Sequence, residues 1–160
     1  MKKKMRKVLL ELLKDSKKSD REIAKDLGVS QPTVSRMRSR LVKEGVIKEF
    51  TVIPDFEKMG YELMAITSCK SKYSEDLEER AVKWAMSRPN VLFAANVTGA
   101  RKNGVVISVH KNYSDYSRFI NDIRLEGGND VQDWDTLLIT LKGFIPKPFS
   151  LKYLAEPEET

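Results

Sequence analysis

Apolar side chains recur every three or four residues through the first third of the chain, and this spacing predicts three short amphipathic helices. The first lies within residues 1–15, the second begins near Asp20, and the third runs over about residues 31–43 and stops before Gly45. The positions expected to face inward are Val8, Leu9, Leu12, Leu13, Ile23, Ala24, Leu27, Val34, Met37 and Leu41. Together these helices should form one small helical core.

The residues at the predicted helix ends support these boundaries. Ser19 and Glu22 have the spacing of a capping box, so the second helix should begin directly after Ser19. Gly28 stands where the helix must stop in a conformation with positive φ. Ser30 is a suitable N-cap for the third helix, and Pro32 is tolerated in its first turn. The pattern is that of two helices joined by a tight turn.

The polar side of the third helix carries the candidate chemistry. Arginine, lysine and serine side chains can contact phosphates or base edges in a major groove. The segment therefore predicts a helix-turn-helix that binds double-stranded DNA, although basic helix faces are often only solvated. The predicted DNA-binding residues are Ser30, Gln31, Thr33, Ser35, Arg36, Ser39, Arg40, Lys43 and Lys48.

The charge distribution agrees with a polyanionic partner. Residues 1–53 hold 15 Lys/Arg and 7 Asp/Glu, a net charge of +8, whereas residues 54–160 hold 14 and 16, a net charge of −2. The apolar part of the N-terminus is short and is interrupted by Glu11, so we expect neither a signal peptide nor a membrane partner. Cys69 and His110 are single, which argues against disulfides, a metal site and a catalytic triad. We expect a cytoplasmic protein that is not an enzyme and has no cofactor.

The remainder of the chain alternates between strand and helix patterns. Residues 46–53 are rich in β-branched side chains and predict a strand, such as a two-stranded wing. Strands are then expected over 63–70, 91–97, 105–109 and 131–141, with helices that begin at Ser74 and near Tyr116 and a turn over 99–104. This order is that of the βαββαβ, ferredoxin-like fold, in which two helices cover one face of an antiparallel sheet.

The uncovered face of that sheet would expose apolar side chains unless a partner covers it. A homodimer through the sheet would cover this face. It would also place the third helices of two chains about 34 Å apart on DNA, if they bind successive major grooves. The predicted class is α+β. The predicted division is a winged helix-turn-helix over residues 1–53, a hinge over 54–60, a sensing and dimerisation domain over 61–142, and a tail over 143–160 whose last residues, 156–160, should be disordered.

The chain resembles the Lrp/AsnC family of prokaryotic transcriptional regulators. The resemblance rests on Glu22-Ile23-Ala24, Leu27-Gly28, Ser30, Thr33-Val34, Arg36-Met37, Arg40-Leu41 and Gly45-Val46-Ile47. It implies a winged helix-turn-helix, a ligand-sensing βαββαβ domain, and dimers that assemble into tetramers, octamers or larger discs. It also implies effectors, typically amino acids, bound near the turn between the second and third strands.

The chain departs from the family at that turn. The family often shows Gly-x-x-Asp there, whereas Gly99 is followed here by Ala-Arg-Lys-Asn-Gly without an acid. Arg101 and Lys102 would favour an anion or a carboxylate, so the candidate effector residues are Gly99, Arg101, Lys102 and Asn103. The alternative is that residues 99–104 form only an exposed hairpin turn, since Asn103-Gly104 is itself a strong turn signal. The sequence leaves open whether an effector binds.

The sequence is compatible with three functions. The first is a sequence-specific transcriptional regulator. The second is an architectural protein that coats DNA with little sequence preference, because phosphate contacts dominate both modes. The third is an enzyme, since some haem-pathway decarboxylases resemble this two-domain architecture; they use histidines and arginines of the second domain, where this chain offers only His110.

Overall fold

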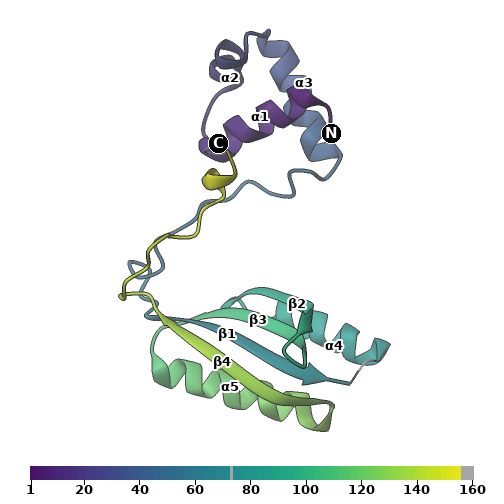
Figure 1. The fold of residues 1–160 in the computed structure, drawn as a ribbon, viewed down its shortest axis with the longest axis vertical. Helices are drawn as coiled ribbons and strands as arrows, with labels where there is room; N and C mark the ends of the chain where they lie inside the picture. Colours follow the sequence, from purple (N-terminus) through teal and green to yellow (C-terminus); the bar gives the residue numbers. More distant parts are fainter. Residues whose placement is uncertain (73, 156–160) are drawn as a thin grey trace. The chain divides into compact units, whose positions relative to one another are not determined.

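The computed structural model describes residues 1–72 and 74–155 and divides the chain into two compact units (Figure 1). Unit 1 contains residues 1–53 together with the described part of the C-terminal segment, 147–155. Unit 2 contains residues 54–146. The chain therefore leaves unit 1, builds unit 2 and returns to unit 1. The segment 156–160, for which disorder was predicted, lies outside the described residues.

Unit 1 is built around three helices, as the sequence predicts. They are α1 (Lys3–Lys14), α2 (Asp20–Leu27) and α3 (Gln31–Lys43). Their buried apolar residues form one core that consists of Met5, Val8, Leu12, Ile23, Ala24, Val34 and Leu41. Leu9, Leu27 and Met37 pack against this core while remaining partly exposed. The predicted helical core is confirmed except for Leu13, which is partly exposed outside the cluster, and Met5 joins the core although it was not predicted there.

The C-terminal segment completes unit 1. Residues Leu151–Ala155 form a short 3₁₀ helix, η2, which packs against α1. Ala155 is buried there. The ammonium group of Lys147 lies 4.1 Å from the ring centre of Tyr153, a cation–π contact that fixes the approach to η2. The tail thus contributes packing to the helical unit.

Residues 46–53 form no strand, so that prediction is wrong for the single chain. The backbone N–H groups of Val46 and Ile47 both donate to the carbonyl oxygen of Leu41, at 2.9 and 3.1 Å. These bonds extend the end of α3 and are not part of a ladder. A strand needs a neighbouring strand to pair with its backbone groups, and β-branched composition cannot supply one. Phe50, Val52 and Ile53 are left exposed.

Unit 2 has the predicted βαββαβ order and is an antiparallel sheet with two helices (Figure 1). The strands lie in the order β2-β3-β1-β4. The elements are β1 (Leu63–Ser71), α4 (Glu75–Met86), β2 (Val91–Gly99), β3 (Lys102–His110), α5 (Tyr113–Gly127), the 3₁₀ turn η1 (Gly128–Asp130) and β4 (Val131–Thr140). The α+β class is confirmed.

The helices cover one face of this sheet. Ala65 of β1 is fully buried in a cluster with Tyr116, Phe119, Ile120 and Ile123 of α5. Because side chains alternate between the two faces of a strand, Ile66 points to the opposite face.

The uncovered face of the sheet is apolar. Directly opposite Ile66 lie Ile107 and Leu137, and Phe93 lies opposite Ile107, so one apolar row crosses all four strands. Phe93 is 53% exposed and Leu137 is 71% exposed. This row is the apolar surface that the sequence anticipates. We call its four residues the open-face row.

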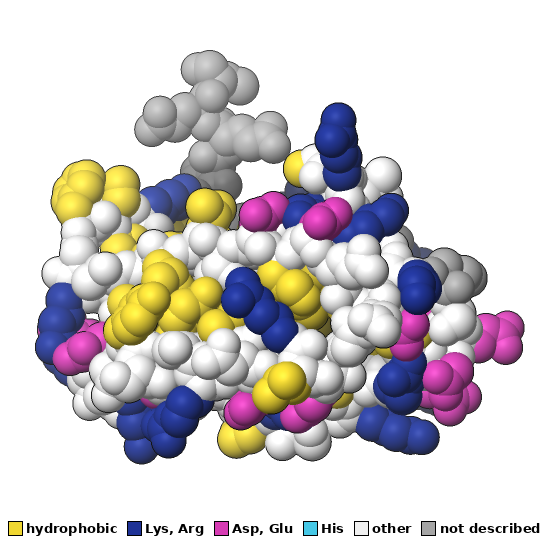
Figure 2. Space-filling model, turned by 90° about the horizontal axis from the view of Figure 1, so that it is seen from below, with side chains coloured by type: hydrophobic (Ala, Val, Ile, Leu, Met, Phe, Trp, Pro, Cys, Tyr) yellow, Lys and Arg dark blue, Asp and Glu magenta, His cyan; other side chains and the backbone are white. Residues whose placement is uncertain are grey.

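Other exposed apolar side chains are scattered. Leu125 of α5 and Met86 of α4 are strongly exposed without belonging to such a row. Figure 2 shows a surface of this kind, where small hydrophobic patches are separated by charged and polar side chains. Isolated exposed apolar residues are normal on soluble proteins, whereas a continuous row needs an explanation.

The chain enters and leaves unit 2 at adjacent points. The backbone N–H of Leu141 donates to the carbonyl oxygen of Glu62 at 2.8 Å, and the ammonium group of Lys142 lies 3.1 Å from the Glu62 carboxylate. These contacts extend the β1–β4 pair by one residue beyond the sheet. Both connections to unit 1 therefore start from the same end of unit 2.

His110 is buried at the end of β3, where it serves the core. Its Nε2 lies 2.8 Å from the hydroxyl of Ser108, and its ring packs against Tyr116 and Phe119. Its Nδ1 lies 3.9 Å from the Asp115 carboxylate. Burial lowers the pKa of His110 below its ordinary value of 6.5, and the Asp115 charge opposes this shift only in part.

This burial predicts a loss of stability in mild acid. Below pH 6.5 the unfolded chain binds a proton at His110 that the folded chain resists, so unfolding becomes easier as the pH falls. The slope is at most about 1.4 kcal/mol per pH unit for one proton. Thermal unfolding followed by circular dichroism from pH 7.5 to 5 measures it. The variant His110→Gln should flatten the curve in this window, and an equal slope in wild type and variant would contradict the assignment.

Candidate DNA-binding surface

The turn between α2 and α3 is set by local hydrogen bonds. The Glu22 backbone N–H donates to the Ser19 hydroxyl at 3.3 Å, while the Ser19 backbone N–H donates to the Glu22 carboxylate at 2.7 Å. This is the predicted capping box. At the other end of α2, Gly28 adopts φ 62° and ψ 40°, and the Val29 N–H returns to the Ala24 carbonyl at 3.0 Å. The left-handed glycine reverses the chain and starts α3.

Arg38 fixes the start of α2 against α3, a role that we did not predict. Its guanidinium donates to the Lys18 carbonyl at 2.8 Å and lies 2.8 Å from the Asp20 carboxylate. Arg38 stands four residues after Val34, at the edge of the buried stripe of α3. A basic residue at the edge of an apolar stripe is the sequence signal that would have identified it.

The predicted DNA-binding residues are brought together on the outer face of α3. Seven of them lie within the helix, and all of these are exposed except Thr33, which is partly exposed. Ser30 precedes the helix at the N-cap. Its hydroxyl pairs with the Thr33 hydroxyl at 2.8 Å and makes no capping bond to the backbone, so only the backbone part of the predicted cap is present. Lys48 is exposed but lies in the irregular segment after α3.

The two arginines on this face differ in their surroundings. The Arg40 guanidinium lies 2.6 Å from the Glu44 carboxylate one turn later. Arg36 has no carboxylate partner among the described residues and is exposed. A phosphate or a base edge would compete with Glu44 for Arg40, whereas Arg36 is available to either.

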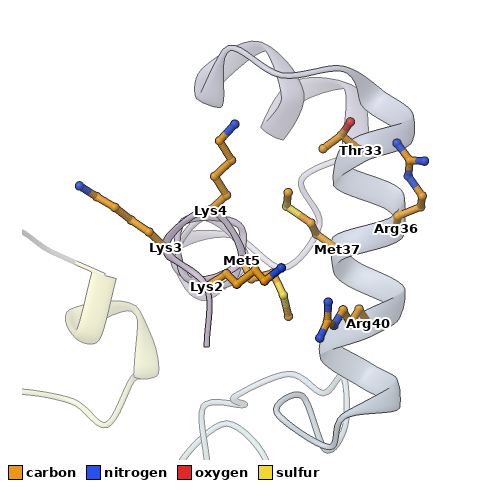
Figure 3. A pocket seen from close by; sticks show the side chains of 8 residues that line it. All are labelled: Lys2, Lys3, Lys4, Met5, Thr33, Arg36, Met37 and Arg40. Carbon is orange, nitrogen blue, oxygen red and sulfur yellow. The ribbon is translucent and has the colours of Figure 1, made fainter.

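A hollow lies between the start of α1 and α3 (Figure 3). Its lining residues are Lys2, Lys3, Lys4, Met5, Thr33, Arg36, Met37 and Arg40. In Figure 3, Lys2 and Met5 extend from α1 toward α3, whereas Lys3 points away from α3. The packing of α1 thus brings lysines from the N-terminus next to two arginines of α3.

The hairpin between β2 and β3 turns at Ala100 and Arg101, within the turn predicted over residues 99–104, but the Asn103-Gly104 pair that supported this prediction is not part of the turn. Both turn residues have positive φ, 47° and 62°, and Gly99 pairs with Lys102 across the turn. Asn103 and Gly104 lie within β3. An Asn-Gly pair favours a turn, but hydrogen bonds to a residue far away in the sequence can override this local preference.

Two of the four candidate effector residues form hydrogen bonds or ion pairs with residues that are distant in the sequence. The Asn103 amide accepts from the Ser71 N–H at 2.7 Å and donates to the Ser71 carbonyl at 2.8 Å. The Lys102 ammonium group lies 2.8 Å from the Asp135 carboxylate and donates to the Asp133 carbonyl. Arg101 is exposed at the tip of the turn, and Gly99 supplies backbone only. These side chains connect β3 to β1 and β4.

The described residues contain no group of three or more His, Cys, Asp or Glu side chains able to hold a metal ion. Burial raises the pKa of the Cys69 thiol above its ordinary value, so less of it is ionised at neutral pH. In the described part of the chain, no helix has the length and apolar character needed to cross a bilayer.

The Asn103 contacts predict a stability effect that involves no ligand. Asn103→Ala leaves the Ser71 N–H and carbonyl without partners in a partly buried setting, which should cost about 1–3 kcal/mol of unfolding free energy. Urea unfolding measures this loss. The matched control is Asn129→Ala at an exposed position of η1, expected to change stability by less than about 0.5 kcal/mol. Equal effects at both positions would contradict the role given to Asn103.

Comparison with known proteins places this geometry in a family. Residues 1–48 match a family model described as winged helix-turn-helix DNA-binding. An uncharacterized HTH-type transcriptional regulator of Pyrococcus horikoshii is 36% identical over 118 residues, which are 74% of this chain and 78% of that protein. The HTH-type transcriptional regulator LrpC of Bacillus subtilis is 30% identical over 93 residues, 58% of this chain and 63% of LrpC.

Solved structures share the fold. The match to the structure of B. subtilis LrpC covers 92% of this chain and 99% of LrpC, with a TM-score of 0.75 at 23% identity. The match to the structure of E. coli AsnC covers 93% of this chain and 97% of AsnC, with a TM-score of 0.74 at 18% identity. The helix-turn-helix, the βαββαβ unit and these relatives lead to one conclusion: the chain belongs to the Lrp/AsnC-like family of HTH-type transcriptional regulators.

Proposed function

We propose that this regulator reads double-stranded DNA with the outer face of α3 inserted in a major groove. The observation that carries the proposal is the division of α3 into two sides. Val34 and Leu41 are fully buried, while the other side of α3 carries exposed hydroxyl, amide and cationic groups. An α-helix fits a major groove, and these groups match the donors and acceptors of base edges and phosphates.

The exposed residues of α3 differ in the length and the charge of their side chains. Arg36 lies near the centre of the helix and has no carboxylate partner in the described part of the chain, so it is the candidate to contact a guanine edge. Ser35, Ser39 and Gln31 are the shorter candidates for neighbouring bases. Arg40, Lys43 and Lys48 lie toward the end of α3 and beyond it, where contacts to the phosphate backbone set affinity and register.

A homodimer formed through the open-face row is the second part of the proposal. The row lies on the face of the sheet opposite the helices and includes two strongly exposed apolar residues. Burial of such surface contributes a favourable free energy of about 25 cal/mol for each Å², which favours association with a second copy. A dimer carries two α3 helices, which suits an operator with two half-sites.

The regulator is favoured over the alternative functions by its relatives. The P. horikoshii and B. subtilis relatives are both named transcriptional regulators, which supports regulation over a decarboxylase on the same architecture. We assign no effector site to the β2–β3 turn, because Lys102 and Asn103 are engaged with β4 and β1. A regulator and an architectural protein differ in the ratio of specific to non-specific affinity.

Arg36→Ala tests the reading face. If Arg36 contacts a guanine, the variant should lose about 1–3 kcal/mol on the specific site and much less on a scrambled duplex. The measurement is a fluorescence-anisotropy titration on DNA from the protein's own promoter and on its scrambled counterpart, at two salt concentrations. Arg21→Ala, an exposed arginine of α2, is the control for removal of one charge. A loss that is equal on both duplexes would make Arg36 a phosphate contact.

Leu137→Asp tests the dimer. The substitution places a carboxylate at the β4 end of the open-face row, where Leu137 is 71% exposed, so the dimer should dissociate at concentrations where the wild type stays associated. Light scattering measures the mass against the 18.3 kDa of one chain. Leu125→Asp makes the same change at an equally exposed position of α5 and should leave the mass unchanged. A wild-type mass of one chain at every concentration would refute the dimer.

A further inference from the structure

The hollow between α1 and α3 has a cationic rim over an apolar floor. It measures about 400 Å³. Met5 and Met37 are its apolar residues, and five of its eight lining residues are lysine or arginine. None of the lining residues is acidic. Such a surface repels other cations and attracts a compact anion.

The charges at the start of α1 oppose the stability of that helix. The positive end of a helix dipole favours acidic side chains, and α2, α4 and α5 each carry them in the first turn. The first turn of α1 has none, and Lys2, Lys3 and Lys4 stand there instead. Each cation at this place is repelled by the positive end of the helix dipole and so weakens the start of α1. A cost of this kind indicates that the lysines serve binding and not the fold.

The place of these lysines relative to the reading face is informative. Arg36 and Arg40 line the hollow from α3 and also belong to the face proposed to enter the major groove. In Figure 3, Lys2 extends from α1 toward these residues. A phosphate backbone borders each major groove, so the strand beside α3 would pass the start of α1.

We propose that Lys2 and Lys4 hold a backbone phosphate of the bound DNA at this hollow, beside the groove occupied by α3. The inference rests on the proposed function and extends it to residues outside the helix-turn-helix. Lysine ammonium groups suit this task as mobile point charges without base selectivity. The contact would therefore add affinity and fix the register of α3, but would not contribute to sequence choice.

The test compares the salt dependence of binding to a duplex of arbitrary sequence. Each neutralised phosphate contributes about 0.9 to the slope of log affinity against log salt. For Lys2→Gln/Lys4→Gln, which removes the contact to that one phosphate, the slope should become shallower by about 0.9 per protomer. Lys83→Gln/Lys111→Gln removes the same charge from exposed positions of unit 2 and should leave the slope unchanged. Lys3 stays in place, because it points away from α3 in Figure 3.

The outcomes separate the inference from the proposed function. An unchanged slope in the Lys2/Lys4 variant would overturn the inference, and so would an equal change in the unit 2 control. If Arg36→Ala still relaxes specificity in that case, the reading face stands without the lysines. If the wild type binds no duplex, both fail together. Thermal unfolding of the Lys2/Lys4 variant should show no loss of stability, because the substitutions remove cations from the positive end of α1.

Discussion

The burial of Val34 and Leu41 determines what unit 1 presents to its surroundings. These two residues are seven positions apart, which is two turns of α3, and both are fully buried against residues of α1 and α2. Their burial fixes the rotation of the helix about its axis. The opposite side must then face outward, and Arg36 and Ser39 stand on it. A change in that core would turn the reading face even if every polar residue on it were kept.

The two units each leave one face unpacked, and the chemistry of the two faces differs. The outer side of α3 is cationic and rich in hydroxyl groups, which suits a hydrated polyanion. The open-face row of unit 2 is apolar, which suits another protein surface. The uneven charge of the sequence follows this division, since the positive excess lies in residues 1–53. Charge and apolarity therefore assign different partners to different units.

The sequence predicts those features that depend on neighbouring residues. The ends of α2 follow from Ser19, Glu22 and Gly28, which act within one or two turns. The structure departs from the sequence-based prediction where a distant partner decides. Asn103 joins β3 because it bonds to Ser71, 32 positions earlier, and residues 46–53 lack the neighbouring strand that their composition favours. The polar face of α3 could be predicted for the same reason as its ends, whereas the hollow beside Lys2 required the packing of α1.

The return of the chain to unit 1 has a consequence for how the protein is made. Helix α1 emerges from the ribosome before unit 2, but η2, which packs against it, is synthesised only after the whole of unit 2. During that interval the surface of α1 that η2 will cover is bare. The helical unit thus begins before unit 2 and is completed after it, so the reader helix lacks the support of the η2 contact while unit 2 is being synthesised.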